Sequence, residues 1–164
     1  MASSRAVNFS ACAAAALLVS SVAGAQQIPT RPYAEYRGDA IIARGTAAQM
    51  GGGVVVPLGL YVRLGVDAAA GATWRYGGTF GSGRVDAIAR FLLDPFRESR
   101  LGFSLGGGVS APIGSAEPSQ PPYMTAVVDI EGRRGHGLTP ALQIGLGGGT
   151  RLGVVLRQSP LQWR

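Results

Sequence analysis

The sequence predicts an all-β protein, an eight-stranded β-barrel that spans a membrane. Three observations predict this fold: an N-terminal export signal, eight segments in which apolar and polar residues alternate, and polar faces on which acids and arginines nearly balance. Successive side chains of a strand point to opposite faces, so each alternating segment is expected to be a strand with one apolar and one polar face. At 164 residues, one domain is expected.

Residues 1–25 have the features of a secretory signal peptide. Arg5 supplies the positive charge, the stretch from Ala11 to Val19 is apolar, and Ala23-Gly24-Ala25 supplies small residues before a cleavage site. The alternative is an N-terminal helix of the folded domain. After cleavage the chain would begin with a short polar lead-in, residues 26–32, and it would contain no cysteine and therefore no disulfide.

The first three expected strands lie before residue 76. The first begins at Tyr33, and its polar face carries Glu35, Arg37 and Asp39. The second, 47–57, alternates more weakly, with Met50, Val54 and Val56 on the apolar face. The third, 60–75, is the clearest of all, because every second residue from Leu60 to Trp74 is apolar.

The fourth segment, 84–94, fits two structures. Val85, Ala87 and Ala89 alternate with charged residues as on a strand, whereas Val85, Ile88 and Leu92 also fit a helical stripe. The alternation of the neighbouring segments and the ending at Asp94-Pro95 favour a strand, and a helix is the alternative.

Four further segments complete the set of eight. They are 100–113, 123–133, 140–147 and 151–157, each with Leu, Ile, Val, Met, Ala or Phe on one face. Glycine- or proline-containing breaks are expected at 45–46, 57–59, 76–82, 95–99, 114–122, 134–138 and 149–150. The Gly-Gly-Gly triplets are expected to allow bends or the close packing of larger side chains.

The charges of the polar faces predict where those faces point. In a membrane barrel the apolar face points outward to lipid and the polar face lines the lumen. A narrow lumen requires ion pairs, since an unpaired buried charge costs several kcal/mol. The candidates for these lumen ion pairs are Glu35, Arg37, Asp39, Arg63, Asp67, Arg75, Arg84, Asp86, Arg90, Asp129, Glu131, Arg133, Arg151 and Arg157. The alternative is the solvated face of a soluble protein.

The chain has an export signal, eight alternating segments and aromatic residues at segment ends (Tyr33, Tyr76, Tyr123). In these features it resembles the small eight-stranded outer-membrane β-barrels of the OmpA/OmpX-like class. The resemblance covers residues 33–158, which leaves 159–164 as a C-terminal tail. It implies antiparallel up-and-down topology with both termini periplasmic and outer loops at 76–82 and 114–122. It also implies a location in the outer membrane of a Gram-negative bacterium. We expect a monomer in contact with outer-membrane lipid or with lipopolysaccharide, whose anionic groups suit the excess of arginine over acidic residues.

The composition argues against several kinds of catalytic, metal-binding and nucleic-acid-binding site. All 15 cationic residues are arginine, which excludes a phosphate loop ending in Gly-Lys and a Schiff-base lysine. One His and one Cys are too few for a structural zinc site, so we expect neither a metal nor a cofactor. There is no basic cluster with interleaved aromatic residues, so no nucleic-acid partner is expected.

One catalytic motif has to be considered. Ser104 lies in a G-x-S-x-G pattern, and Asp129 and His136 follow in the order of a hydrolase triad. That motif needs a strand, a sharp turn and a helix, whereas Ser104 lies inside an alternating segment, so no catalytic residue is expected. The predicted function is a structural outer-membrane barrel with an ion-paired lumen or a narrow pore; the alternative is a soluble exported barrel that binds a small apolar ligand.

Overall fold

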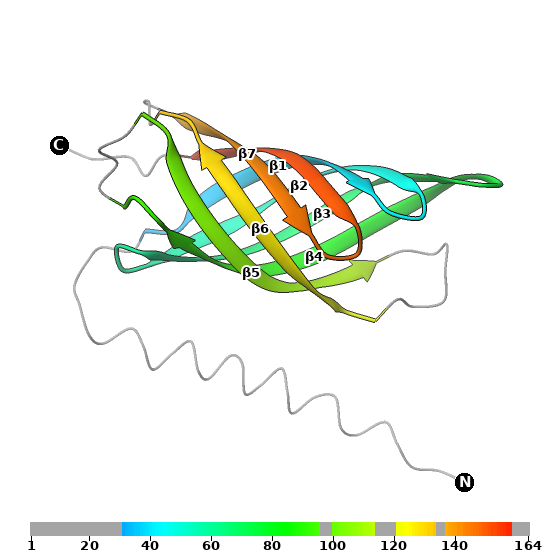
Figure 1. Cartoon of the computed structure of the whole chain (residues 1–164), viewed down its shortest axis with the longest axis horizontal. Coiled ribbons are helices and arrows are strands. Elements are labelled where there is room, and N and C mark those ends of the chain that lie inside the picture. Colours follow the sequence, from blue (N-terminus) through cyan, green and yellow to red (C-terminus); the bar gives the residue numbers. More distant parts are fainter. Residues whose placement is uncertain (1–30, 96–99, 114–120, 134–136, 159–164) are drawn as a thin grey trace, which may run out of the picture.

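The structure is a computed structural model that describes residues 31–95, 100–113, 121–133 and 137–158. These ranges contain eight strands: β1 (Tyr33–Ile42), β2 (Thr46–Leu58), β3 (Val62–Arg75), β4 (Gly78–Leu92), β5 (Gly102–Ile113), β6 (Tyr123–Glu131), β7 (Leu138–Leu146) and β8 (Thr150–Gln158). Each strand pairs antiparallel with the next, and β1 pairs with β8 to close a barrel (Figure 1). The predicted antiparallel up-and-down eight-stranded barrel is therefore confirmed. Within the described ranges, no helix is long and apolar enough to cross a membrane.

The barrel has two distinct ends. At the terminal end β1 begins and β8 ends; β2, β4 and β6 also end there, because neighbouring strands run antiparallel. At the far end β1, β3, β5 and β7 end. The β3–β4 hairpin reaches furthest at this end, at the right of Figure 1. The predicted signal peptide, most of the lead-in and the C-terminal tail lie outside the described residues.

The fourth segment is a strand, as favoured, and it begins earlier than expected. β4 pairs with β3 from Gly78 to Phe91 and with β5 from Gly83 to Leu92. The expected break at 76–82 is wrong, because the turn occupies only residues 76–77. Gly77 has a φ of +106°, which a side chain disfavours, and this permits a tight turn directly into β4. The third strand also begins later than expected, since residues 59–61 form a turn.

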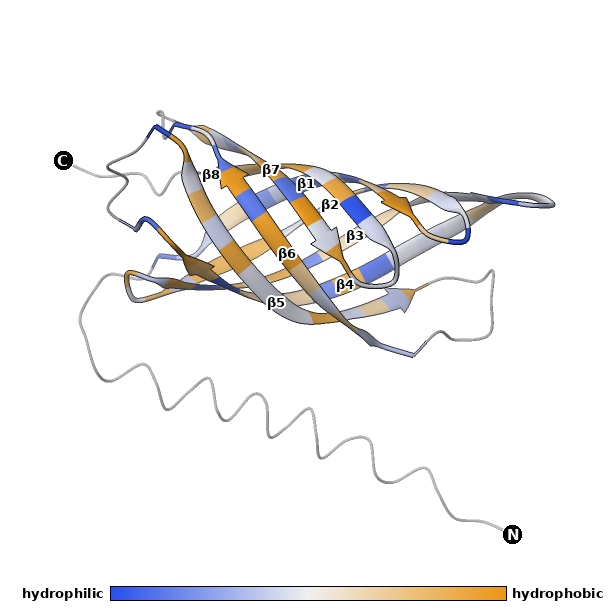
Figure 2. Ribbon diagram, in the orientation of Figure 1, coloured by the Kyte–Doolittle hydropathy of each residue, from blue (hydrophilic) through white to orange (hydrophobic). Residues whose placement is uncertain are grey.

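Alternate residues of every strand point into the barrel or away from it. Outward-pointing apolar side chains are exposed, such as Met50 at 78% and Val154 at 55%. Figure 2 shows hydrophobic and hydrophilic residues alternating along β6 and β7. Inward-pointing side chains are buried, and most of the large ones are polar or charged, with Val55, Ile88 and Val127 among the apolar exceptions.

Inward-pointing glycines make room inside the barrel. A Cβ atom on Gly51, Gly71 or Gly108 would lie about 2 Å from a carbonyl oxygen of the neighbouring strand. A Cβ on Gly153 would lie 2.0 Å from Oδ1 of Asp39, and one on Gly65 would lie 2.8 Å from Nη1 of Arg90. These glycines therefore allow neighbouring strands to approach closely and long charged side chains to fit between them.

Two adjacent glycines of β5 provide a matched test of this packing. Replacing inward Gly108 by Ala would place a Cβ 1.9 Å from the carbonyl oxygen of Ala87, whereas outward Gly107 has no atom nearer than 3.7 Å. We expect Gly108→Ala to lower the free energy of unfolding by about 1–3 kcal/mol. Gly107→Ala is expected to change it by less than about 0.5 kcal/mol. Urea unfolding followed by tryptophan fluorescence measures both; equal effects would contradict the inward assignment.

Candidate functional site

The interior of the barrel holds twelve charged side chains that share an inward position and an exposure of at most 8%. They are Glu35, Asp39, Asp67, Asp86, Asp129 and Glu131 together with Arg37, Arg63, Arg84, Arg90, Arg151 and Arg157. They come from β1, β3, β4, β6 and β8, and most are spaced two or four residues apart along their strand. The period-two alternation therefore gathers them inside the barrel, where they form two clusters.

The first group, here called the terminal cluster, consists of Glu35, Arg63, Arg90, Asp129, Glu131 and Arg157. Arg157 is at its centre: its Nε lies 2.8 Å from Oε2 of Glu35 and its Nη2 lies 2.5 Å from Oδ2 of Asp129. Arg157 also pairs with Glu131, which accepts a second hydrogen bond from Nη1 of Arg63 at 2.6 Å. Because each carboxylate serves two arginines, the cluster joins β1, β3, β4, β6 and β8 across the interior.

The second group, here called the central cluster, consists of Arg37, Asp39, Asp67, Arg84, Asp86 and Arg151. Arg37 Nε lies 2.8 Å from Oδ2 of Asp39, and its Nη1 lies 2.5 Å from Oδ1 of Asp67. Asp86 Oδ2 accepts from Nε of Arg84 at 2.9 Å and from Nη1 of Arg151 at 2.6 Å. Arg84 also pairs with Asp39, and Nη1 of Arg37 lies 3.4 Å from Oδ2 of Asp86, so these four residues form a closed ring of contacts.

Two glutamines complete the network, and sequence reasoning did not single out either of them. Gln143 joins the clusters, because its Oε1 accepts from Nη2 of Arg37 at 2.5 Å and its Nε2 donates to Oδ1 of Asp129 at 2.7 Å. Gln49 accepts from Nη1 of Arg84 at 2.6 Å and donates to Oγ of Ser82 at 3.1 Å. Their inward register on β7 and β2 is the sequence signal that would have identified them.

Charge balance explains how so many ionised groups are tolerated in the interior. Each cluster contains three carboxylates and three arginines, so its formal charge is zero. Arginine stays protonated in proteins and donates in a fixed planar geometry that suits carboxylates. Removing one partner of such a buried ion pair therefore costs about 3–5 kcal/mol of folding free energy, because the other charge is left uncompensated in the interior.

The described residues around Ser104 form no nucleophile elbow. Ser104 is the third residue of β5, and its buried hydroxyl lies 3.4 Å from Oδ2 of Asp129, to which it donates. His136, the third member of the pattern, lies outside the described residues. No group of three or more His, Cys, Asp or Glu that could hold a metal ion is found among the residues described.

Two of the predicted lumen residues lie outside both clusters. Arg133 lies two residues beyond the end of β6 at Glu131 and is exposed at the terminal end, although the amide of Gly132 still donates to the carbonyl of Pro140 at 2.8 Å. The expectation that Arg133 lies in the lumen is therefore wrong. Arg75 is the last residue of β3; it has the inward register but is exposed at the mouth of the far end.

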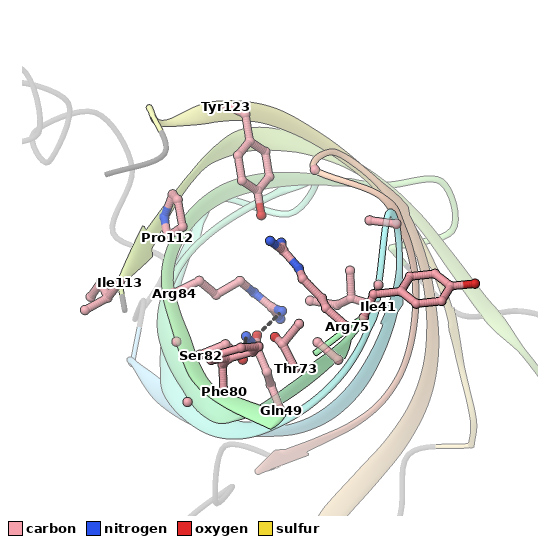
Figure 3. Close-up of a pocket in the computed structure, with 17 residues that line it drawn as sticks. Ile41, Gln49, Thr73, Arg75, Phe80, Ser82, Arg84, Pro112, Ile113 and Tyr123 are labelled. Carbon is pink, nitrogen blue, oxygen red and sulfur yellow. Dashed lines mark hydrogen bonds between the residues drawn. The ribbon is translucent and has the colours of Figure 1, made fainter. Parts of the chain in front are cut away.

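A cavity of about 420 Å³ opens at the far end of the barrel. Gln49, Ser82 and Arg84 lie at its base, where the central cluster begins. Figure 3 shows Arg75 and Tyr123 projecting into the mouth from different strands, with the guanidinium and the hydroxyl pointing toward one another. The barrel is thus filled by ion pairs in its middle and at its terminal end, and is hollow at its far end.

The fold has a solved counterpart. The chain is similar to the N-terminal β-barrel domain of OprF from Pseudomonas aeruginosa, with a TM-score of 0.54 and 13% sequence identity over 77% of this chain and 96% of that one. No family model and no curated protein matches the chain. At this identity the likeness establishes a shared eight-stranded barrel fold, and the interior charges have to be interpreted from this chain alone.

Removing one carboxylate from the central cluster tests the charge balance. Asp86→Ala leaves Arg37, Arg84 and Arg151 with two acids, and we expect it to lower the free energy of unfolding by about 3 kcal/mol or more. The matched control is Arg133→Ala, which removes an exposed charge and is expected to cost less than about 0.5 kcal/mol. Urea titration of the folded barrel measures both variants. An Asp86→Ala barrel as stable as the control would show that the interior charges are solvated rather than mutually paired.

Proposed function

We propose that the protein is a structural outer-membrane β-barrel whose interior is closed by ion pairs. The observation that carries the proposal is the inverted distribution of side chains, with charges buried inside and large apolar residues exposed outside. A soluble β-barrel has the opposite arrangement, because its apolar face forms the core and its charged face meets water. A bilayer favours the inverted arrangement, since lipid covers the outward face.

The shape of the apolar surface supports lipid as the partner. Exposed large apolar side chains come from all eight strands, for example Tyr36 of β1, Met124 of β6 and Leu152 of β8. They therefore form a belt around the barrel rather than the single patch that a protein partner would cover. At the terminal end the exposed rings of Tyr61 and Phe91 stack 5.7 Å apart, and at the far end Trp74 and Tyr76 are exposed, as expected for aromatic girdles at two interfaces.

The interior favours a closed barrel over a pore. An eight-stranded barrel is just wide enough for side chains to fill it. Here the two clusters span the interior and are joined by Gln143. The same filling speaks against a soluble barrel that binds an apolar ligand in its core, because such a site is lined mainly by apolar side chains.

Orientation and partners follow from the proposed location. With an export signal, the terminal end would face the periplasm and the far end the exterior. Among the described residues of the far-end turns and adjoining strand ends, the exposed charged side chains are Arg44 and Arg75. Two cationic groups at this position suit the phosphate groups of lipopolysaccharide. A closed barrel leaves no free strand edge for pairing with another chain, which supports a monomer.

A charged substitution on the outward face distinguishes the bilayer from water. Val128 lies near the middle of β6 and is 42% exposed, and Leu138 begins β7 at the terminal end and is 50% exposed. In vesicles we expect Val128→Arg to cost about 2–4 kcal/mol of folding free energy and Leu138→Arg about 0–1 kcal/mol. Reversible urea titration in phospholipid vesicles measures the difference. If both cost less than about 0.5 kcal/mol, as exposed sites in water do, the membrane assignment fails.

Cell fractionation tests the location. The full chain, expressed in a Gram-negative host, is expected in the outer-membrane fraction, with a gel mobility that changes on boiling because the closed barrel resists unfolding by detergent. A soluble periplasmic band whose mobility is the same before and after boiling would contradict the proposal.

A further inference from the structure

Every exposed charged side chain in the part of the chain that the structure describes is an arginine. Six of the seven acidic residues there are buried in the two clusters, and the seventh, Asp94, is half-buried and has an interaction partner within the protein. The exposed arginines are Arg31, Arg44, Arg75, Arg100 and Arg133. The interior clusters are therefore neutral, whereas the charge of the described surface is cationic.

Three of these arginines, here called the rim arginines, lie at the terminal end of the barrel. Arg31 lies two residues before β1, Arg100 lies two residues before β5, and Arg133 lies two residues after β6. The pair of β5 and β6 nearest to this end is Gly102 with Glu131. Because Arg100 and Arg133 each lie two residues beyond that pair, they leave the rim at the same place.

The rim arginines lie on opposite sides of the barrel. β1 and β5 are four strands apart in a closed ring of eight, so Arg31 lies on the other side of the rim from Arg100 and Arg133. A folded protein partner would cover a single patch, whereas the headgroups of a bilayer surround the whole barrel. The distribution of the cations therefore favours lipid headgroups as the occupant.

Exposed apolar side chains lie beside the rim arginines. Leu101 and Phe103 follow Arg100 in the sequence and are 49% and 42% exposed. On the neighbouring strand, Leu138 begins β7, which pairs with β6, and it is 50% exposed. A phospholipid has the same order of groups, with a phosphate next to its acyl chains. One lipid molecule can therefore contact an arginine and the apolar belt at once.

We propose that the terminal end binds anionic phospholipids, whose phosphate groups accept hydrogen bonds from the rim arginines. The inference rests on the proposed membrane function and adds which lipids cover this end of the barrel. A guanidinium stays protonated, and its planar fork suits a phosphate. Each arginine at the surface of an anionic membrane strengthens binding about fivefold, and salt weakens the attraction. A zwitterionic headgroup carries a cation of its own and therefore binds the rim arginines less strongly.

The folded protein in nanodiscs tests the proposal. The fraction of phosphatidylglycerol in phosphatidylcholine is raised, and the backbone amide NMR signals of Arg31, Leu101 and Arg133 are followed. We expect these signals to shift saturably with phosphatidylglycerol, and added salt to weaken the response. No shift, or a shift that rises linearly without saturation, would overturn the proposal.

The same experiment separates this inference from the proposed function. A protein that does not enter nanodiscs contradicts the membrane assignment and this inference with it. A protein that enters them and shows no preference for phosphatidylglycerol at the terminal end contradicts this inference alone.

Two variants separate the rim arginines from the general charge of the protein. Arg100→Gln is expected to raise the fraction of phosphatidylglycerol at half of the Leu101 shift about fivefold. Arg44→Gln removes an exposed arginine at the far end and is expected to leave the Leu101 response unchanged. Both proteins should keep the gel mobility of the folded barrel, so that a lost response is not mistaken for unfolding. An unchanged response in Arg100→Gln, or an equal loss in both variants, would refute the assigned surface.

An acidic peptide tests the alternative that the rim docks a protein. In nanodiscs of phosphatidylcholine alone, we expect an oligoglutamate peptide to leave the Leu101 and Arg133 signals unchanged. A saturable shift with this peptide would assign the rim to a protein partner and contradict the lipid assignment.

Discussion

An arginine stays protonated even inside a protein, so each buried guanidinium in this barrel requires a carboxylate beside it. That constraint links strands that are distant in the sequence. Arg157 of β8 meets Glu35 of β1, and Arg63 of β3 meets Glu131 of β6. A slip of one residue in any of these strands would turn its charges outward and leave their partners buried alone. The ion pairs therefore specify the register of the barrel as well as filling it.

The outward face and the cavity both follow from the same alternation. Every second side chain points into the interior. The side chains between them point outward, and the large apolar ones among these form the belt around the barrel. The interior is also unevenly filled along its length. Charge pairs occupy the terminal end and the middle, whereas at the far end inward residues such as Thr73 and Ser82 leave a hollow above Arg84. Inward glycines supply the space that the long arginines need.

Period-two alternation was sufficient to predict the strands, including the ambiguous fourth one, because an inward and an outward face impose it on the sequence. It could not show where a strand ends. Alternation continues past Glu131, yet strand β6 ends there and Arg133 is exposed. The glycine-rich start of β4 was predicted to be a loop because glycine is common in turns, although residues 78–82 pair with β3. The register of a strand predicts which face a side chain occupies, but not how deep in the barrel the side chain lies. Arg75 has the same inward register as the buried charges and is therefore predicted among them, although it is exposed at the mouth of the far end. The contacts of Gln143 with Arg37 and Asp129 depend on how the barrel closes, which no local pattern encodes.

The central claim is that charge faces inward while apolar side chains face lipid, and two pairs of adjacent valines test it most directly. Val128 and Val154 are 42% and 55% exposed on the outward face, whereas their neighbours Val127 and Val155 are at most 1% exposed inside the barrel. Nuclear Overhauser effects between valine methyl groups and lipid acyl chains can be measured on the methyl-labelled barrel in nanodiscs. The account predicts cross-peaks from acyl chains to Val128 and Val154 and none to Val127 and Val155. Cross-peaks to the inward pair, or cross-peaks from water instead of lipid to the outward pair, would contradict it.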